Sequence, residues 1–507
     1  MGHFRFEVPE SARGLLDDSL VPDAYLCGIE GVPFQTKVEY DGGAIKLTRN
    51  LDSSAKLHLT CRLPKIGLRT LSTCSLHPCE RNDSYSLPLE LARGSCHMAR
   101  LQGDVWKQAG LEAGPLYENK LAEGTEHFLK AAATQDAPEV STAAAIEAIS
   151  ILQSSLDDLG TRYAIQSISN RKNRENQLAT LVAASVIPPE PFPNLQAPAT
   201  TSAWVTYCEA FNTAAVRMSW ADIETDSGTL NFEATDRLVD RSVEAGLRIV
   251  AGPLIDFRAR LLPHWLYLLE DNFDALLASA VSFVEKVVVR YRGRVQVWNA
   301  ASGLNTPGPI QLDDEQAMRL AVGILQTVRR TDPNTAAILS FDQPCGEYLA
   351  RHRNGISPMH FADAISRSGL GMAGLGIEFR MGYQSDATPP RSAVDIGTTI
   401  DRWATLGMPL LITLAVPGGQ GGDHHALAPV PLLDLGEENA DAEGWQLKIA
   451  GPLLKTMLAK PIVHGIVWEG WHDGRPHVGS HAGLVNAEGH PKPLLEYISR
   501  LRQDFLF

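Results

Sequence analysis

Acidic side chains stand at or beside the ends of several short apolar runs. The runs AAILSFD, GLGIEF and VHGIVW carry Asp342, Glu378 and Glu469 in this way, and Asp256 and Asp473 occupy similar places. Of two paired carboxyl groups, one can protonate a departing oxygen while the other attacks or activates water, as in the cleavage of a glycosidic bond. Glu378 and Glu469 are therefore candidate catalytic acids. The alternative is a set of structural salt bridges, which are common and also perturb pKa values; the arginines available for them are Arg217, Arg258 and Arg380.

Aromatic side chains accompany these acids. Trp298 and Trp468 lie in two of the apolar runs, and Trp471 and Tyr383 follow shortly after two of them. Aromatic rings stack on the C–H faces of sugars, whose hydroxyls take hydrogen bonds from polar groups. The alternative is that the tryptophans are buried for packing alone. The candidate substrate-binding residues are Trp298, Arg380, Tyr383, Asp256, Asp342, Trp468, Trp471 and Asp473.

The segment GGQGGDHHA holds Asp423, His424 and His425 on a glycine-rich loop. Adjacent histidines point in different directions, so a metal site here would need ligands from elsewhere in the chain. None of the seven cysteines forms the CxxC spacing that is typical of zinc sites. We predict neither a metal ion nor another cofactor.

Short apolar strands and amphipathic helices alternate from about residue 175 onward, which is typical of a parallel sheet wrapped by helices. Eight such pairs in 175–507 match the size of a single (β/α)8 barrel, in which strand-end residues converge at one mouth. The sequence thus predicts an α/β fold with a C-terminal TIM barrel. Its strands are expected at 178–186, 213–220, 247–255, 295–300, 336–342, 374–379, 409–416 and 463–468.

Two regions precede the barrel. Residues 1–87 contain short extended runs, with Asp41-Gly42-Gly43 as a hairpin signal between alternating segments, and are expected to form a β-sandwich-like domain. Residues 88–174 change to a helical period and predict three helices. The β-rich domain suits either glycan binding or a packing and oligomerisation role.

Composition excludes some partners. The formal net charge of −14, with no cluster of Lys and Arg, argues against nucleic acid. No run approaches the roughly 18 apolar residues that span a bilayer, and the start MGHFRFEVPE does not resemble a signal peptide. We expect a cytoplasmic protein without a membrane partner. The sequence does not decide whether the chain forms a homo-oligomer.

Several segments resemble, in order, those of the family 10 glycoside hydrolases, the xylanase family, over about 210–500. FNTAAVRMSW is similar to the family's second strand, VQVWNAASGLN to its Trp-Asp-Val-Val-Asn-Glu run and PLLITLAV to its Ile-Thr-Glu-Leu-Asp run. IVWEGWHDG resembles the Trp-rich eighth strand, and Pro491–Pro493 precedes the closing helix. The resemblance implies a xylanase-like barrel that binds an oligosaccharide or polysaccharide.

The family's two catalytic glutamates are missing at the positions that this resemblance assigns. The acid/base position falls on Gly303 and the nucleophile position on Leu414, neither of which can transfer a proton or form a glycosyl ester. No Asp or Glu lies between Trp298 and Asp313, or between Asp401 and Asp423. Where the family has Gln-x-His on strand six, this chain has Glu378-Phe379-Arg380.

These observations predict a pseudoenzyme that has lost the family's retaining mechanism and serves in carbohydrate binding or assembly. One alternative is an active hydrolase of β-linked oligosaccharides with relocated carboxylates, Glu378 and Glu469. Another is a structural scaffold with an inert barrel.

Overall fold

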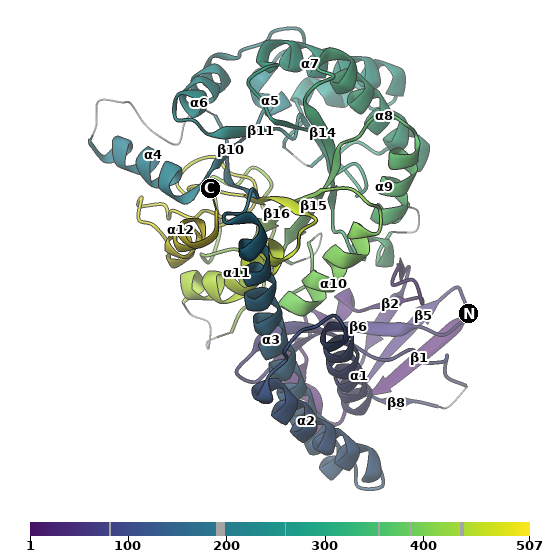
Figure 1. The fold of residues 1–507 in the computed structure, drawn as a ribbon. Coiled ribbons are helices and arrows are strands. Elements are labelled where there is room, and N and C mark those ends of the chain that lie inside the picture. Colours follow the sequence, from purple (N-terminus) through teal and green to yellow (C-terminus); the bar gives the residue numbers. More distant parts are fainter. Residues whose placement is uncertain are drawn as a thin grey trace. The chain divides into compact units, whose positions relative to one another are not determined.

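The computed structural model describes residues 1–80, 83–188, 198–258, 260–352, 355–384, 387–436 and 441–506, of which 198–202 are described as backbone only. The chain forms two compact units (Figure 1). The first comprises Met1–Asn170, Cys345–Asn354 and Thr388–Thr399, and the second comprises Arg171–Pro344, Gly355–Ala387 and Ile400–Phe507.

Two four-stranded sheets begin the first unit. One has the order β4-β5-β1-β8 (Lys37–Tyr40, Ala44–Arg49, Gly2–Glu7, Tyr85–Ser86), and the other has the order β3-β2-β6-β7 (Pro33–Phe34, Tyr25–Cys27, Lys56–Leu63, Gly67–Ser72). Both sheets contribute to one apolar core, because alternate side chains such as Phe4 and Phe6 point to the same face. Asp41 Oδ1 accepts hydrogen bonds from the backbone N–H of Gly43 and Ala44, which confirms the predicted hairpin between β4 and β5.

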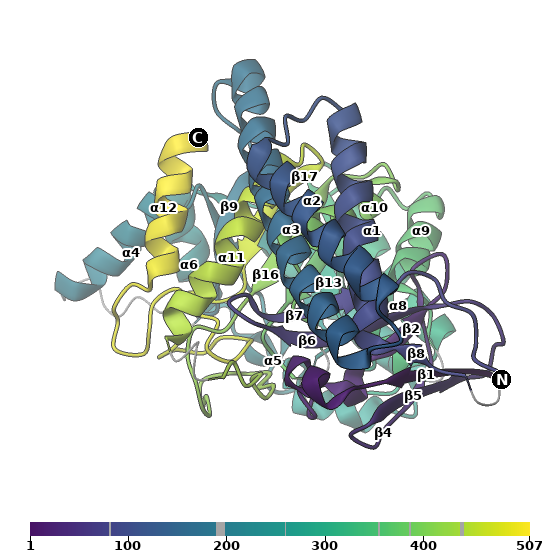
Figure 2. The same cartoon turned by 90° about the horizontal axis from the view of Figure 1, so that it is seen from below.

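Three helices complete this core: α1 (Leu87–Gln108), α2 (Pro115–Ala133) and α3 (Pro138–Glu175). They lie side by side in both views (Figures 1 and 2). The three helices are those that the change of period predicted.

The second unit is a closed parallel barrel. Its strands are β9 (Leu181–Val186), β10 (Thr213–Val216), β11 (Arg248–Ala251), β12 (Ile255–Asp256), β13 (Val297–Ser302), β14 (Ala336–Asp342), β15 (Gly374–Arg380), β16 (Leu410–Ala415) and β17 (Val463–Trp468). The barrel closes because β9 pairs with both β10 and β17. The third predicted strand is divided into β11 and β12, which both pair with β13. The predicted α/β barrel is confirmed.

Helices follow the barrel strands, as the alternation predicted (Figure 1). Side-chain caps fix where some of them begin; Asp313 and Gln316, for example, form a reciprocal capping box at the start of α8. The helices are α4 (Pro198–Ala210), α5 (Trp220–Ile223), α6 (Glu233–Glu244), α7 (Phe273–Tyr291), α8 (Asp314–Thr331), α9 (Pro358–Arg367), α10 (Ala393–Ala404), α11 (Ala442–Ala459) and α12 (Pro493–Phe505). Among the described helices, none has a stretch long and apolar enough to cross a membrane.

The barrel interior changes from apolar to charged along the strands. One layer consists of the buried side chains Ala183, Ala215, Val250, Ile338, Leu411 and Val467. Since side chains alternate along a strand, residues two positions further on share this inner face and stand nearer the mouth. The inner face of β15 accordingly leads from Gly374 and Gly376 to Glu378 and Arg380. The strands thus deliver charges to the carboxyl end of the barrel.

Candidate functional site

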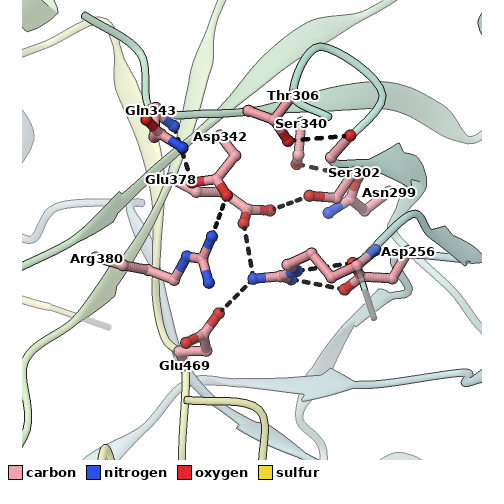
Figure 3. A network of polar contacts seen from close by, with 12 residues as sticks. Asp256, Asn299, Ser302, Thr306, Ser340, Asp342, Gln343, Glu378, Arg380 and Glu469 are labelled. Atoms are coloured by element: carbon pink, nitrogen blue, oxygen red, sulfur yellow. Dashed lines mark hydrogen bonds and ion pairs between the residues drawn. The ribbon is translucent and has the colours of Figure 1, made fainter. Parts of the chain in front are cut away.

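Four carboxyl groups and three guanidinium groups meet at the carboxyl ends of the strands. Asp342 and Glu378 are register partners on β14 and β15, and Glu469 follows β17. All seven residues are buried, so none of these charges is freely hydrated. The group is called the mouth network below; its members are Arg217, Asp256, Arg258, Asp342, Glu378, Arg380 and Glu469. Figure 3 labels Asp256, Asp342, Glu378, Arg380 and Glu469 among them.

Arg258 is the centre of the mouth network. Its Nε and Nη2 atoms donate to the two carboxylate oxygens of Asp256, at 2.7 and 2.6 Å. Its remaining terminal nitrogen, Nη1, lies 3.0 Å from Oε1 of Glu469 and 3.5 Å from Oε2 of Glu378. Glu378 and Glu469 are thus brought together as the sequence suggested, but one guanidinium group stands against both.

The other two arginines also pair with acids of the network. Arg380 donates to Asp342, and Arg217 contacts Asp256. These are the salt bridges that the sequence set against a catalytic role. A buried charge without such a partner is strongly unfavourable, so each acid and each arginine helps to hold the other in place.

The network moves the pKa values of neighbouring acids in opposite directions. Burial acts to raise the pKa of Glu378, but Arg258 and the Ser302 hydroxyl, which donates to Oε1 at 2.6 Å, hold it below its ordinary value. Burial raises the pKa of Asp342, with Arg380 acting against the rise. Burial also lowers the pKa of Arg217 to about 10. Glu378 therefore favours the carboxylate, and Asp342 takes up a proton more readily than an ordinary aspartate.

The two positions that the xylanase resemblance assigned to catalysis hold no acid at the mouth. Gly303 follows β13 with a left-handed φ of 75°. Leu414 is fully buried on β16; because Thr413 lines the barrel interior, Leu414 faces the helices instead. The residues beside them that face inward are Ser302 and Thr413, which carry hydroxyls. A shift in register between Asn299 and Ala301 turns Ser302 toward the network.

The predicted stacking residues are all buried in packing positions. The Nε1–H of Trp298 donates to Asp332 at 3.0 Å and that of Trp468 to the carbonyl of Ala482 at 2.6 Å. The ring of Trp471 meets that of Tyr207 edge to face. The Tyr383 hydroxyl donates to the carbonyl of Ser480. These rings support the strands and loops and present no open face to a sugar.

Asp473 lies outside the mouth network and fixes the loop after β17. Its carboxylate pairs with Lys492 at 2.6 Å and accepts from the backbone N–H of Gly483 at 2.6 Å. Both charged side chains are buried. This arrangement holds the loop against the start of α12.

The glycine-rich loop after β16 is fastened through Asp423. Its Oδ2 atom accepts from Nε2 of His477 at 2.8 Å and from the backbone N–H of His481 at 2.8 Å. Burial acts to raise the pKa of Asp423, but these hydrogen bonds lower it well below its ordinary value. The partner His477 has a raised pKa, because the hydrogen bond to Asp423 outweighs burial. Within the described ranges, no group of three or more His, Cys, Asp or Glu side chains is arranged to hold a metal ion.

Two cavities adjoin the network. An enclosed one of about 20 Å³ lies inside the barrel among Arg217, Glu378, Thr413 and Glu469, and has room for about one water molecule. A larger one of about 490 Å³ lies at the mouth; its polar wall consists of Arg258, Arg260, Asp342, Gln343 and Arg380. Its size lies within the range of about 300–1,000 Å³ that is common for small-molecule sites. Glu378 and Glu469 line the small cavity and not the large one.

Sequence reasoning missed Gln343 and the apolar wall of the larger cavity. Gln343 directly follows the strand-end acid Asp342, and its backbone N–H donates to Asp342 Oδ1 at 2.8 Å. The sequence signal that could have identified Gln343 is its position directly after a predicted strand. The facing apolar wall contains Pro307, Pro309, Leu427, Pro429 and Val430. These residues belong to long loops, whose course no periodicity indicates.

Comparison with known proteins gives structural likenesses at low identity. No protein-family model matches the sequence, and no curated protein matches it. Solved structures that are similar include xylanase 10B from Thermotoga maritima (15% identity, covering 67% of this chain and 97% of that one, TM-score 0.49). Another is xylanase 10B from Thermotoga petrophila RKU-1 in complex with xylobiose (15%, 66% and 96%, TM-score 0.48). A third is a GH10 endoxylanase retrieved from a sugarcane soil metagenome (15%, 64% and 97%, TM-score 0.47).

Proposed function

We propose that the barrel mouth binds a carbohydrate without cleaving it. The observation that carries this proposal is the position of Arg258 against both Glu378 and Glu469, at 3.5 and 3.0 Å from the same nitrogen. In a retaining hydrolase the two carboxyl groups flank the scissile bond about 5–5.5 Å apart, with the sugar between them. Here one guanidinium nitrogen lies within ion-pair distance of both carboxylates, where a hydrolase would hold the sugar between its two acids.

The protonation of Glu378 is a further argument against hydrolysis. A general acid must keep its proton near the working pH, which hydrolases achieve by raising the pKa of one carboxyl group. The pKa of Glu378 is instead lowered, because Arg258 and Ser302 stabilise the carboxylate. Glu378 also lies behind the wall of the large cavity, so a ligand there does not reach it.

The large cavity supports the binding half of the proposal. Its volume of about 490 Å³ suits a small ligand, and its wall combines charged and amide groups with proline and aliphatic side chains. Sugars present hydroxyls at their edges and apolar C–H groups on their faces, which such a wall can match. Because the tryptophans are buried in packing positions, the apolar contacts come from residues such as Pro307 and Leu427.

One observation favours a second candidate, a hydrolase with relocated acids. Asp342 lines the large cavity and has a raised pKa, while its register partner Glu378 has a lowered one. A pair of acids whose pKa values are pushed apart is the usual mark of an acid and a base. Against this candidate, Asp342 is tied to Arg380, and Glu378 faces the enclosed cavity.

Calorimetric titration with a panel of neutral and acidic oligosaccharides, combined with turnover assays on the matching aryl glycosides, separates these functions. We expect saturable binding and no release of aglycone. Turnover that is lost in Asp342→Asn or Glu378→Gln, and kept in the exposed control Glu315→Gln, would establish the hydrolase instead. If no sugar binds, and none raises the melting temperature, the barrel does not act as a carbohydrate-binding site.

A further inference from the structure

The charges on the wall of the mouth cavity are unequal. Three guanidinium groups, those of Arg258, Arg260 and Arg380, stand on this wall against the single carboxyl group of Asp342. Two acids, Asp256 and Glu469, balance the charge of Arg258. Both lie behind the wall and do not line the cavity. A ligand in the cavity therefore meets more positive than negative groups.

Two of the arginines on the wall, Arg258 and Arg380, are buried, and the charge of Arg380 has fewer acidic partners than that of Arg258. Its one carboxylate partner by hydrogen bonding within the described residues is Asp342. Burial and the neighbouring Glu378 both raise the pKa of Asp342, with Arg380 acting against the rise. Arg258, in contrast, contacts three acids. An added anion next to Arg380 would gain more than one next to Arg258.

Two residues that line this cavity each have a buried side-chain atom without a hydrogen-bond partner among the described residues. One such atom is the Nε–H donor of Arg380, and the other is the Oε1 acceptor of Gln343, a residue that is only 2% exposed. Leaving a buried polar atom unsatisfied is unfavourable, so these atoms favour a ligand that supplies both an acceptor and a donor. In Figure 3 the side chains of Arg380 and Gln343 lie on opposite sides of the Asp342 carboxyl group.

The geometry points to a sugar acid as the ligand of this cavity, with its carboxylate against Arg380, a hydroxyl donating to Gln343 Oε1, and its ring against the proline and aliphatic wall. A hexuronic acid residue, alone or in an oligosaccharide, is the ligand class with these three features. This inference rests on the proposed function and adds the charge of the ligand to it. Arginine suits the role because its planar group can donate two parallel hydrogen bonds to one carboxylate.

Glucuronate and glucose form a matched pair of probes, because they differ only in the carboxylate that replaces a hydroxymethyl group. We expect calorimetry at low salt to show at least tenfold tighter binding of glucuronate, and the same order for oligosaccharides that end in each sugar. The difference should shrink as salt is added, since part of it comes from exposed Arg260.

Two variants locate the carboxylate. Arg260→Glu changes an exposed side chain at the cavity and is expected to weaken glucuronate binding several-fold more than it weakens glucose binding. Gln343→Glu places a negative charge beside Arg380 and should remove most of the preference for the acid. The exposed Arg319→Glu on α8, which does not line the cavity, is the control and should change neither affinity.

The outcomes are distinguishable. Equal binding of glucose and glucuronate would overturn the charge inference and leave the proposed function standing. Binding of neither sugar would refute both. If inorganic phosphate or acetate displaced glucuronate when present at the same concentration as glucuronate, the cavity would be a general anion site. That result would also overturn the inference.

Discussion

Arg258 and Glu469 form a buried ion pair across the barrel mouth, with 3.0 Å between Nη1 and Oε1. One residue follows β12 and the other follows β17, and β9 and β10 lie between these parts of the barrel, so the contact joins strands that are not neighbours. The same nitrogen also lies near Glu378. Removing this one side chain would leave several buried carboxylates without their main counter-charge.

Arg258→Met should therefore destabilise the barrel by about 3–5 kcal/mol, the usual cost of removing one partner of a buried ion pair. The free energy of unfolding in urea measures this effect. Arg330→Met is the matched control, because Arg330 pairs with Glu285 on the surface with both side chains exposed, and should cost less than about 1 kcal/mol. Equal effects of the two substitutions would show that the mouth network does not depend on Arg258.

A glutamate introduced at Leu414, the position that the xylanase resemblance assigns to the nucleophile, should not confer hydrolysis. Leu414 faces the helices and lies in register between Phe379 and Trp468, all three fully or almost fully buried. Leu414→Glu places a charge in this apolar layer, so we expect a loss of about 3 kcal/mol or more in unfolding free energy and no turnover of aryl glycosides. Leu414→Met keeps the volume and should cost less than about 1.5 kcal/mol. A stable, active Leu414→Glu variant would mean that this residue faces the mouth.

The hydroxyl of Ser302 should stabilise the barrel in a pH-dependent way. It donates to the Glu378 carboxylate, whose pKa is held below its ordinary value of 4.5. Such a group contributes stability above the pKa of the unfolded chain, and the contribution is lost as the pH falls through the lower pKa of the folded state. Ser302→Ala should thus cost about 1.5–3 kcal/mol at pH 7 and clearly less near pH 3.

Ser340→Ala is the control for this profile, because the Ser340 hydroxyl bonds to the neutral amide of Asn299 at 3.1 Å. Its cost in urea unfolding should be the same at both pH values. If Ser302→Ala also showed no change with pH, the Glu378 group would not be held as a carboxylate by Ser302.

The Asp423–His477 hydrogen bond should hold two mouth loops together over a limited pH range. The pKa of His477 is raised above 6.5, so its stabilisation is present below 6.5 and is lost as the pH rises through the higher folded value. The pKa of Asp423 is lowered, so its contribution is lost only in strong acid. We expect hydrogen exchange in 418–430 to be slower at pH 6 than at pH 9, after correction for the intrinsic rate. Asp423→Asn should remove the difference, and a difference that persists would place its origin elsewhere.

The barrel was predictable because its elements carry local signals. Strands such as 336–342 and 463–468 are short apolar runs between amphipathic helices, and the structure has strands within these same bounds. The candidate acids Glu378 and Glu469 were found by the same reasoning, since strand ends meet at one face of a barrel. Local pattern was sufficient for the elements and for the end at which the acids gather.

The direction of individual side chains was not predictable from local pattern. The register shift after Asn299 turns Ser302 inward, and it depends on how β13 and β14 pair. Trp298 has the composition of a stacking residue, yet its indole bonds to Asp332 at the end of α8. Two segments between barrel strands, Cys345–Asn354 and Thr388–Thr399, belong to the first unit. These outcomes rest on contacts between residues distant in the sequence.

We propose that the mouth binds a sugar and leaves it intact, because Arg258 pairs with both Glu378 and Glu469. The most direct test is mass spectrometry of an oligosaccharide recovered from its calorimetrically defined complex after long incubation at pH 5 and pH 7. If the mouth binds the sugar without cleaving it, we expect full recovery of the unchanged ligand at both pH values. Cleavage products that form with the intact protein, and not with Glu378→Gln or Glu469→Gln, would contradict it.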